Sequence, residues 1–356
     1  YNDPEYFQAL FLSIFRFTSS VTMSLDQSLQ LLRHWGQTAL EHLPPQAQDV
    51  LLHPLVPKAL TAFLALGIIS KANRSLGYWA ANNWQRAKPW QNERELVLVT
   101  GGCSGIGKQI MEDLAKAGVR VVILDIQEPS FQLPSNVAFY KADITSSENI
   151  RNVAEKIRAT HGDPTVLVNN AGVGHDGCIL DEPEAKIRQT FEVNTVSHFL
   201  MVREFLPSMI KQNHGHVITI ASMASFVALG EIVDYCCTKA SALAFHEGLG
   251  QELRLWYKAP KVRTSVIHPH WVKTPMIKIL TDVGHQFRGP ILTTEMISAA
   301  VVKQILTQSS GQVIIPSHFS VISLIRAFPS WLQEAARGKG SKDLRVLRDV
   351  QEAKGL

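Results

Sequence analysis

The chain has 356 residues, of which 46% are hydrophobic and 19% are charged, and this composition excludes global disorder and a collagen-like structure. Its net charge is +4, and no run of Lys and Arg is interleaved with aromatic residues, so we expect no nucleic-acid binding. The four cysteines are scattered without CxxC spacing, which argues against a zinc cluster or a disulfide scaffold and favours a reducing compartment.

Residues 1–90 form a first zone, which is rich in Leu, Ala, Trp and Phe and shows no strand-like alternation. Its most apolar stretch, Leu60–Ile69, is shorter than the roughly 20 apolar residues of a membrane span, and prolines and charged residues flank it. A single clean transmembrane helix is therefore not expected. Tryptophans near Arg and Lys later in the zone suit a membrane interface. Two interpretations stay open: association with a membrane or lipid surface, or packing on the core or on a second subunit.

Residues 91–316 alternate short runs of Val and Ile with helical patterns. The predicted strands are Leu96–Val99, Val119–Leu124, Val137–Tyr140, Val166–Val168, Val217–Ile220, Arg263–Ile267 and Gln312–Ile315. The predicted helices are 106–117, 147–161, 184–212 and 234–257. Strands that alternate with helices imply a parallel sheet covered on both faces. We therefore predict a doubly wound, Rossmann-type α/β fold with helical extensions at both ends of the chain.

The first predicted strand leads directly into a glycine-rich loop, Thr100–Gly107. Glycines let such a turn bring its backbone close to a phosphate, and the following helix offers its free N–H groups and positive dipole end to a pyrophosphate. Asp125 ends the next strand, 18 residues past Gly107, close to the spacing expected for a carboxylate that binds a ribose 2′-hydroxyl. Strand, loop, helix and acid together predict a dinucleotide site.

Asp125 also discriminates between the two nicotinamide cofactors. Its carboxylate would accept a hydrogen bond from the 2′-hydroxyl of NAD(H) and would repel the 2′-phosphate of NADP(H). Neither Cys103 in the loop nor Ile126 after the acid supplies a compensating positive charge. We therefore expect the cofactor to be NAD.

Further polar residues follow the later strands. Asn169–Gly172 follows the fourth predicted strand, Asn194 lies in a helical segment, and Ser222 follows the fifth strand. Tyr235 and Lys239 are four residues apart, so they share one helix face. An ammonium beside a phenol is expected to lower the tyrosine pKa from its usual value of about 10. A tyrosine adjusted in this way exchanges a proton with an alcohol near neutral pH.

In this order and spacing, the motifs resemble those of the short-chain dehydrogenase/reductase superfamily over residues 91–275. The resemblance implies that Tyr235 is the general acid/base and that Ser222 hydrogen-bonds the substrate oxygen. It implies that Lys239 holds the ribose hydroxyls and lowers the pKa of Tyr235, and that Asn194 positions a water in a proton relay. The implied cofactor contacts, with no metal, are Thr100, Gly101, Ser104, Gly105, Ile106, Gly107, Asp125, Asp143, Ile144, Asn170, Ala171, Gly172, Tyr235, Lys239, Val272 and Thr274.

The loop after the sixth strand departs from the family pattern, because His270 stands where the family usually has a glycine. His270 either touches the substrate or is a tolerated loop variant. Further on, the apolar and aromatic stretch His318–Trp331 either lines the mouth of the substrate cleft or packs on the sheet or a partner. The basic residues beyond it are expected to form a mobile tail.

The apolar extensions resemble the membrane-associated branch of the superfamily, which contains retinol dehydrogenases and 17-beta-hydroxysteroid dehydrogenases. We divide the chain into a helical extension (1–90), an NAD-binding catalytic domain (91–316) and an apolar, then basic, tail (317–356). The resemblance implies NAD(H)-dependent interconversion of a lipophilic alcohol (retinoid, steroid, long-chain or terpenoid) and its carbonyl. It also implies a homodimer or homotetramer at a cytosol-facing endoplasmic reticulum membrane or lipid droplet. Two alternatives stay open: an NADP(H)-dependent carbonyl reductase, and a non-catalytic nucleotide-binding protein at a lipid surface.

Overall fold

The computed structural model describes residues 41–53, 55–277 and 289–354, together with a few positions between 26 and 38. The chain divides into two compact units, Tyr1–Ser75 and Leu76–Leu356. The first unit contains helix α3 (Pro45–Leu52) and most of helix α4 (Leu55–Ala81), which ends in the second unit. Most of the predicted N-terminal zone before position 41 lies outside the described residues.

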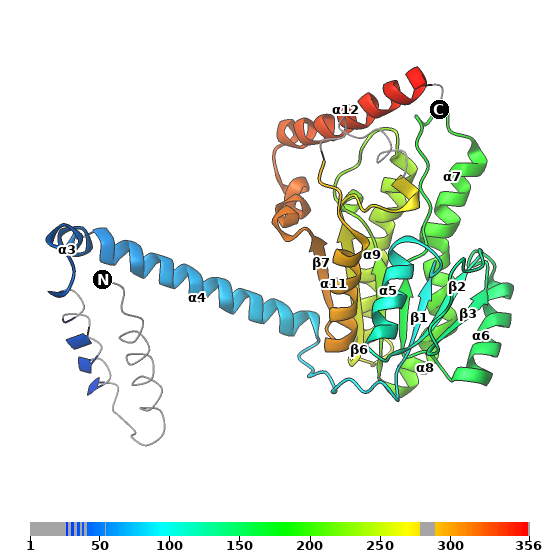
Figure 1. The fold of residues 1–356 in the computed structure, drawn as a ribbon, viewed down its shortest axis with the longest axis horizontal. Helices are drawn as coiled ribbons and strands as arrows, with labels where there is room; N and C mark the ends of the chain where they lie inside the picture. The colour runs from blue at the N-terminus through cyan, green and yellow to red at the C-terminus, as the bar shows by residue number, and fades with distance from the viewer. Residues whose placement is uncertain are drawn as a thin grey trace. The chain divides into compact units, whose positions relative to one another are not determined.

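The second unit holds a seven-stranded sheet in the order β3-β2-β1-β4-β5-β6-β7, in which every pairing is parallel (Figure 1). The strands are β1 (Leu96–Thr100), β2 (Arg120–Asp125), β3 (Val137–Lys141), β4 (Val166–Asn169), β5 (Gly215–Ile220), β6 (Val262–Pro269) and β7 (Gly311–Ile315). All seven predicted strands are confirmed, with ends that differ by one or two residues. Because the strand order changes direction between β1 and β4, the fold is the doubly wound α/β fold predicted from the sequence.

Side chains alternate between the two faces of the sheet, and each face has its own core. On β1, Leu96 and Leu98 belong to one core, whereas Val97 and Val99 belong to the other. The first core is covered by α6 (Ser147–His161), α8 (Ser197–Gln212) and α9 (Val233–Leu255), and the second by α5 (Gly105–Lys116) and α11 (Thr294–Thr307). The sequence located four of these helices and did not locate α11.

The helix predicted over 184–212 has an internal irregularity. It consists of α7 (Glu184–Phe191), a π-helical turn (Glu192–Val196) and α8. π-Helical turns are rare and occur frequently at functional sites. This turn carries Asn194, one of the candidate site residues.

Helix α4 runs without a break from Leu55 to Ala81, and it includes the whole of Leu60–Ile69. Pro57 lies in the first turn, where its missing N–H costs no helical hydrogen bond. In the described part of the chain, α4 is the one helix that is long and apolar enough to cross a membrane, and none of its residues is buried. The prolines and charged residues that flank Leu60–Ile69 therefore do not end the helix, which is longer than the apolar stretch.

Within the second unit, the segment that follows α4 is bonded to the amino ends of β6 and β7. Asn82 is buried, and its side chain accepts a hydrogen bond from Ser310 N at 2.8 Å. Arg263 on β6 donates to the carbonyl oxygens of Asn82 and Gln85 at 2.7 and 2.8 Å. Because a buried guanidinium needs acceptors, these bonds fix the segment that leads into β1.

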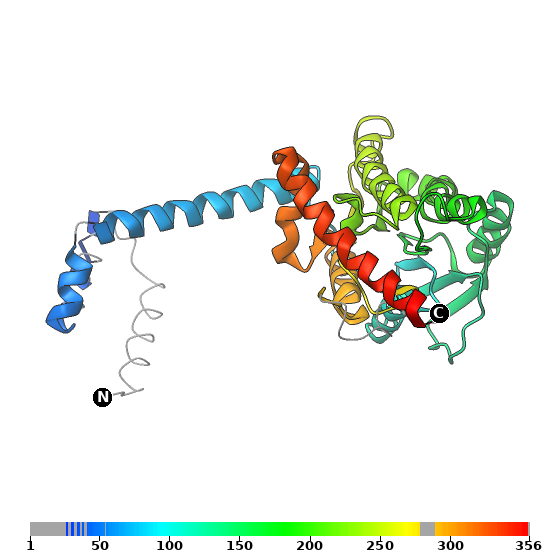
Figure 2. The same cartoon turned by 90° about the horizontal axis from the view of Figure 1, so that it is seen from above.

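After β7 the chain forms a 3-10 helix, η6 (Ser317–Ala327), and then α12 (Ser330–Lys354). Figures 1 and 2 both show α12 lying across the carboxyl edge of the sheet. Its Ser341 Oγ accepts a hydrogen bond from Gly230 N at 3.0 Å, and its Arg348 donates to Cys178 Sγ at 3.2 Å. The expectation of a mobile basic tail was therefore wrong, because this segment is a helix bonded to the domain.

Candidate active site

The glycine-rich loop follows β1 at the point where the strand order reverses. Gly101 and Gly105 have φ angles of +67° and +52°, which residues with a side chain adopt only with strain. A Cβ on Gly107 would stand 2.1 Å from the Gly101 carbonyl oxygen and 2.5 Å from Asn170 Nδ2. The first turn of α5 therefore packs on the loop with no space for a side chain, and the backbone itself forms the surface that a ligand would meet.

The residues after β4 hold the loop in place. Thr100 Oγ1 accepts hydrogen bonds from Asn170 N and Ala171 N, both at 3.0 Å. The Asn170 side chain donates in turn to the Thr100 carbonyl oxygen at 2.9 Å. The two motifs that the sequence placed after β1 and β4 thus form one hydrogen-bonded unit.

The amino end of α5 fits the pyrophosphate of a dinucleotide. Ser104 is the N-cap, its side chain makes no capping hydrogen bond, and the first turn of this described helix has no acidic residue. Ile106 packs against the core below. The N–H groups of the first turn and the positive end of the helix dipole therefore remain available to an anion.

Asp125 lies beside this loop at the carboxyl end of β2. Its carboxylate accepts hydrogen bonds from Cys103 N and Gln127 N, both at 3.0 Å. Burial, and then the charge of Asp125, raise the pKa of the Cys103 thiol to about 11, so this thiol is neutral at pH 7. The carboxylate therefore gives this end of the loop a negative charge.

Asp143 and Ile144 follow β3 at the same edge of the sheet. The Asp143 carboxylate accepts hydrogen bonds from Thr145 N at 2.9 Å and Thr145 Oγ1 at 2.7 Å, which fixes it within its own turn. Ile144 is buried in the core between the sheet and α6. The structure thus holds both residues rigidly next to the strand that carries Asp125.

The loop after β6 approaches the glycine loop from the other side. Val272 is buried and forms a parallel bridge with Leu292. A Cβ on Gly105 would lie 3.2 Å from Thr274 Cγ2, so Thr274 borders the start of α5. Thr274 therefore borders the glycine loop, and the contact of Val272 and Thr274 with the nicotinamide stays a prediction.

Asn194 is held by the backbone that follows the motif after β4. Its Oδ1 accepts from Val173 N at 2.8 Å, and its Nδ2 donates to the Val173 carbonyl oxygen at 2.7 Å. A Cβ on Gly172 would be 3.3 Å from Asn194 Oδ1 and 3.7 Å from Lys239 Nζ. Because Gly172 has no side chain, the amide of Asn194 and the ammonium of Lys239 converge above it.

Ser222 lies just after β5. Its Oγ accepts a hydrogen bond from Ala224 N at 3.2 Å and caps a short 3-10 helix, η3 (Met223–Ser225). Its carbonyl oxygen lies 3.0 Å from His268 Nδ1. Burial lowers the pKa of His268 to about 4, so the neutral ring donates this hydrogen bond through Nδ1. The backbone of Ser222 is thereby tied to the end of β6.

Tyr235 and Lys239 lie in the first turns of α9. Lys239 is buried, its Nζ donates to the Ile220 carbonyl oxygen at 2.9 Å, and this atom is 5.4 Å from the ring centroid of Tyr235. Burial lowers the pKa of Lys239 to about 8. Burial also raises the pKa of Tyr235 to about 12, because it outweighs the hydrogen bond with Ser222 that lowers it. The prediction that Lys239 lowers the pKa of Tyr235 was therefore wrong for this structure.

The contacts of His270 favour the second of its two predicted roles, that of a loop variant. Its Nδ1 is 3.2 Å from the Pro290 carbonyl oxygen, and its ring centroid is 5.1 Å from that of Phe319 on η6. Burial lowers the pKa of His270 more than the Pro290 hydrogen bond raises it. The imidazole is thus packed between two segments of the chain.

Two features of the site were not predicted. Thr238 Oγ1 accepts from Asn194 Nδ2 at 3.2 Å and donates to the Tyr235 carbonyl oxygen at 2.8 Å, so it links these two residues. The second feature is Met276, which lies near the Tyr235 ring. A Cβ on Gly174 would lie 3.3 Å from this ring and 3.5 Å from Met276 Sδ. Thr238 sits beside Lys239 in the sequence and could have been found from its neighbour, whereas Met276 carries no sequence signal.

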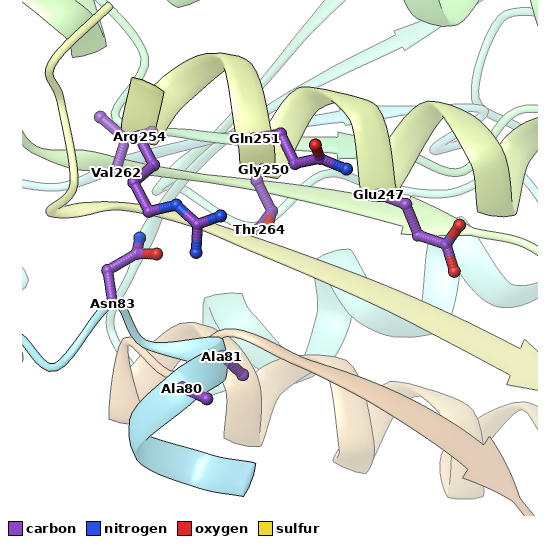
Figure 3. Close-up of a pocket in the computed structure, with 9 residues that line it drawn as sticks. All are labelled: Ala80, Ala81, Asn83, Glu247, Gly250, Gln251, Arg254, Val262 and Thr264. Carbon is purple, nitrogen blue, oxygen red and sulfur yellow. The ribbon is translucent and has the colours of Figure 1, made fainter. Parts of the chain in front are cut away.

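A cavity of about 170 Å³ lies elsewhere in the second unit (Figure 3). It is lined by Ala80, Ala81, Asn83, Glu247, Gly250, Gln251, Arg254, Val262 and Thr264. Val262 and Thr264 belong to the start of β6, so this cavity lies at the amino edge of the sheet. The glycine loop lies at the opposite, carboxyl edge, and the cavity is therefore separate from the candidate active site.

The reversal of strand order, the glycine loop and the acid after β2 together define a dinucleotide-binding α/β protein. The sequence pattern of the family described as short chain dehydrogenase matches residues 95–283. The chain belongs to the short-chain dehydrogenase family, whose members are oxidoreductases with a nicotinamide cofactor.

Curated relatives agree with this assignment. The chain is 40% identical over 225 residues to Dehydrogenase RED2 of Cochliobolus heterostrophus, which covers 61% of this chain and 85% of the relative. It is 33% identical over 239 residues to human estradiol 17-beta-dehydrogenase 11, which covers 65% of this chain and 78% of the relative. The predicted resemblance to the 17-beta-hydroxysteroid dehydrogenase branch is therefore confirmed.

Solved structures confirm the fold. The 3-ketoacyl-(acyl-carrier-protein) reductase of Brucella melitensis, complexed with NADH, has a TM-score of 0.57 at 21% identity and covers 63% of this chain and 98% of its own. The ligand-free aldohexose dehydrogenase of Thermoplasma acidophilum has a TM-score of 0.55 at 19% identity and covers 62% of this chain and 92% of its own.

Proposed function

We propose that this protein is an NAD(H)-dependent alcohol dehydrogenase/ketone reductase. The observation that carries the proposal is the convergence of four side chains at the carboxyl ends of neighbouring strands. Ser222 hydrogen-bonds Tyr235, while Asn194 and Lys239 converge above Gly172. A protein that only bound a nucleotide would have no use for a partly buried phenol placed beside a serine hydroxyl.

In alcohol oxidation, the Tyr235 phenolate takes the hydroxyl proton of the substrate, and the Ser222 hydroxyl hydrogen-bonds the substrate oxygen. Lys239 binds the ribose hydroxyls of the nicotinamide half, and Asn194 holds a water through which the proton reaches solvent. A bound NAD would supply the acceptor for the hydride that leaves the carbinol carbon, and a bound NADH would supply the hydride donor for the reverse reaction. In carbonyl reduction, the Tyr235 phenol donates its proton to the substrate oxygen.

The cofactor contacts are proposed for the same residues that the sequence singled out. The loop from Thr100 to Gly107, with Ser104, Gly105 and Ile106, would hold the pyrophosphate at the start of α5. The Asp125 carboxylate would accept a hydrogen bond from the ribose 2′-hydroxyl. The other proposed contacts are Asp143 and Ile144 at the adenine, Asn170 and Ala171 under the cofactor, and Val272 and Thr274 at the nicotinamide amide.

We expect Asp125→Asn to weaken the preference for NAD over NADP. Asparagine keeps the size of the side chain and removes the charge that repels a 2′-phosphate. A hydrogen bond to a charged group contributes about 1.5–3 kcal/mol, so the ratio of kcat/KM values for NAD and NADP should fall about 10- to 100-fold. Glu128→Gln is the matched control, because this exposed carboxylate lies three residues away and pairs with Lys141. An unchanged ratio in Asp125→Asn would support the NADP(H)-dependent alternative.

Alcohol oxidation should become faster with rising pH. Oxidation needs the Tyr235 phenolate, and a pKa raised to about 12 leaves this form a small minority at pH 7. Its fraction, and with it kcat/KM for oxidation, increases as the pH rises from 7 to 9. Carbonyl reduction needs the phenol, which stays protonated throughout this range. The titration of Tyr235 therefore leaves kcat/KM for reduction unchanged between pH 7 and 9. Steady-state profiles in both directions measure this, and an oxidation profile that is level from pH 7 upward would contradict it.

We propose that the substrate is a lipophilic alcohol, such as a retinoid, steroid, long-chain or terpenoid alcohol, met at a membrane or lipid-droplet surface facing the cytosol. The unburied apolar helix α4 and the relatives named estradiol 17-beta-dehydrogenase 11 support this proposal. We also propose a homodimer or homotetramer formed through the long helices α8 and α9, and Phe199 on α8 is exposed.

The test is NADH formation by the full chain in detergent, against a panel of lipophilic alcohols, at several pH values. Turnover of at least one alcohol with NAD would support the proposal. A protein that binds NAD and turns over no alcohol of the panel, and reduces none of the matching carbonyls, would instead support a non-catalytic nucleotide-binding protein at a lipid surface.

A further inference from the structure

Helix η6 is apolar on two faces, and only one of them is covered. A 3-10 helix has three residues per turn, so residues three apart lie on one face. Phe319, Ile322 and Ile325 pack on Met223 and Phe226 in a small core. Met223 directly follows Ser222, so this inner face of η6 lies against the candidate active site.

The outer face of η6 continues into an exposed apolar surface. Val321 and Leu324, three residues apart, are 56% and 59% exposed. Phe328 and Trp331 follow in the connection to α12, and Trp331 is 71% exposed. Contiguous exposed apolar side chains of this kind mark an interaction site rather than ordinary solvent-facing surface.

Exposed cations accompany these side chains. Arg326 lies on η6, and Lys339, Lys342 and Arg345 follow one another at three-residue intervals on α12. The opposite face of α12 meets the domain through Ser341 and the buried Leu344.

By helical spacing, Trp331, Lys342 and Arg345 share one face of α12. Among the acidic residues of the same stretch of helix, Glu334 is paired with Arg337, which leaves the exposed Asp343 beside these cations. The surface is therefore apolar at one end and net positive along the rest.

We propose that Val321, Leu324, Phe328 and Trp331, with these four cations, form a lipid-docking surface that binds an anionic phospholipid membrane. Apolar and aromatic side chains enter the boundary between headgroups and acyl chains, and Lys and Arg neighbours bind anionic headgroups. A second copy of this chain fits this surface less well, because a two-fold contact would bring the same cations face to face. The inference rests on the proposed lipid-surface association and adds a contact made by the catalytic unit itself, independent of residues 1–75.

The lipid-docking surface would bring the membrane to the edge of the sheet that carries the candidate active site. It follows β7, so it lies at the carboxyl edge of the sheet, where the glycine loop and Ser222 also lie. Only the thickness of η6 and the small core with Met223 separate it from Ser222. A lipophilic alcohol in a membrane bound at this surface would therefore be held at the same edge of the sheet as the candidate active site.

The test uses quenching of tryptophan fluorescence by phospholipids brominated on their acyl chains, with the full chain in vesicles. The difference between the wild type and Trp331→Phe isolates the signal of Trp331 from that of the other tryptophans. Trp256→Phe is the matched control, because Trp256 is 69% exposed and lies at the end of α9, away from the lipid-docking surface. We expect quenching of Trp331 and none of Trp256 in vesicles that contain anionic phospholipid.

The charge requirement is tested with the triple variant Lys339→Gln, Lys342→Gln and Arg345→Gln. Each cation near an anionic surface contributes about fivefold to binding, so quenching of Trp331 should be lost at a lipid concentration that saturates the wild type. The control removes three exposed lysines elsewhere, Lys211, Lys258 and Lys261, and should leave quenching unchanged.

Three results would overturn the proposal. Trp331 unquenched by any vesicle, or quenched equally in neutral and anionic vesicles, would exclude an anionic lipid as the occupant. Trp331 protected by self-association without lipid would make the surface an interface between copies. None of these readouts needs turnover, so quenching without NADH formation would contradict only the proposed activity, and turnover without quenching would contradict only the lipid-docking surface.

Discussion

Tyr235→Phe is expected to lower kcat for alcohol oxidation by about 1000-fold and to leave NAD binding intact. General acid/base catalysis by a positioned side chain contributes about 100- to 10,000-fold, and the variant removes the only atom of Tyr235 that exchanges a proton. The phenyl ring keeps its place against Gly174 and Met276, so the cleft keeps its shape. Steady-state kinetics with the best alcohol of the panel and fluorescence titration with NAD measure the two effects.

Tyr140→Phe is the control for this substitution. Tyr140 lies on β3, and its hydroxyl is 3.1 Å from His161 Nε2, so the change also removes a partly buried hydrogen bond, far from Ser222. It should lower stability slightly and leave kcat unchanged. Wild-type turnover in Tyr235→Phe would assign the proton transfer to another group and remove the main support for the proposed mechanism.

The sequence predicted the sheet well because the strands are short apolar runs, most of them rich in Val and Ile, and several are buried on both faces, as in Val97–Val99 and Val121–Leu124. Such runs can be recognised from local composition alone, and a turn or a helix lies on each side of them. The candidate site was predictable for a related reason. Its residues follow strands of a parallel sheet, so their order along the chain places them at one edge.

Features that depend on the folded environment were not predictable. The π-helical turn at Asn194 changes the helix by one residue, which leaves no mark on apolar spacing. The pKa of Tyr235 depends on how deeply the phenol is buried, and the interval of four residues to Lys239 carries no information on burial. Helix α12 contains Gly338 and Gly340, which weaken a helix locally, and its contacts with Gly230 and Cys178 come from distant parts of the chain.

The second large effect is expected for Gly107→Ala, which should weaken NAD binding about 100-fold and reduce stability. The added Cβ would stand 2.1 Å from the Gly101 carbonyl oxygen and 2.5 Å from Asn170 Nδ2, and neither neighbour is the free end of a flexible side chain. The start of α5 must move away from the loop, which displaces the N–H groups that would meet the pyrophosphate. A displacement of about 1 Å in a positioned site costs about 100-fold in reaction rate, and we expect a loss of the same order in NAD affinity. Overpacking lowers the free energy of unfolding by about 1–3 kcal/mol.

Gly248→Ala is the matched substitution for this test. Gly248 lies inside α9, and a Cβ there would have no neighbour within 4 Å. Because alanine is a better helix former than glycine, this variant should be more stable by about 0.5–1 kcal/mol and should bind NAD as the wild type does. Urea unfolding and calorimetric titration with NAD distinguish the two variants. If Gly107→Ala bound NAD with wild-type affinity, the dinucleotide would have to lie elsewhere than on the amino end of α5, and the assignments of Ser104, Gly105 and Asp125 would fail with it.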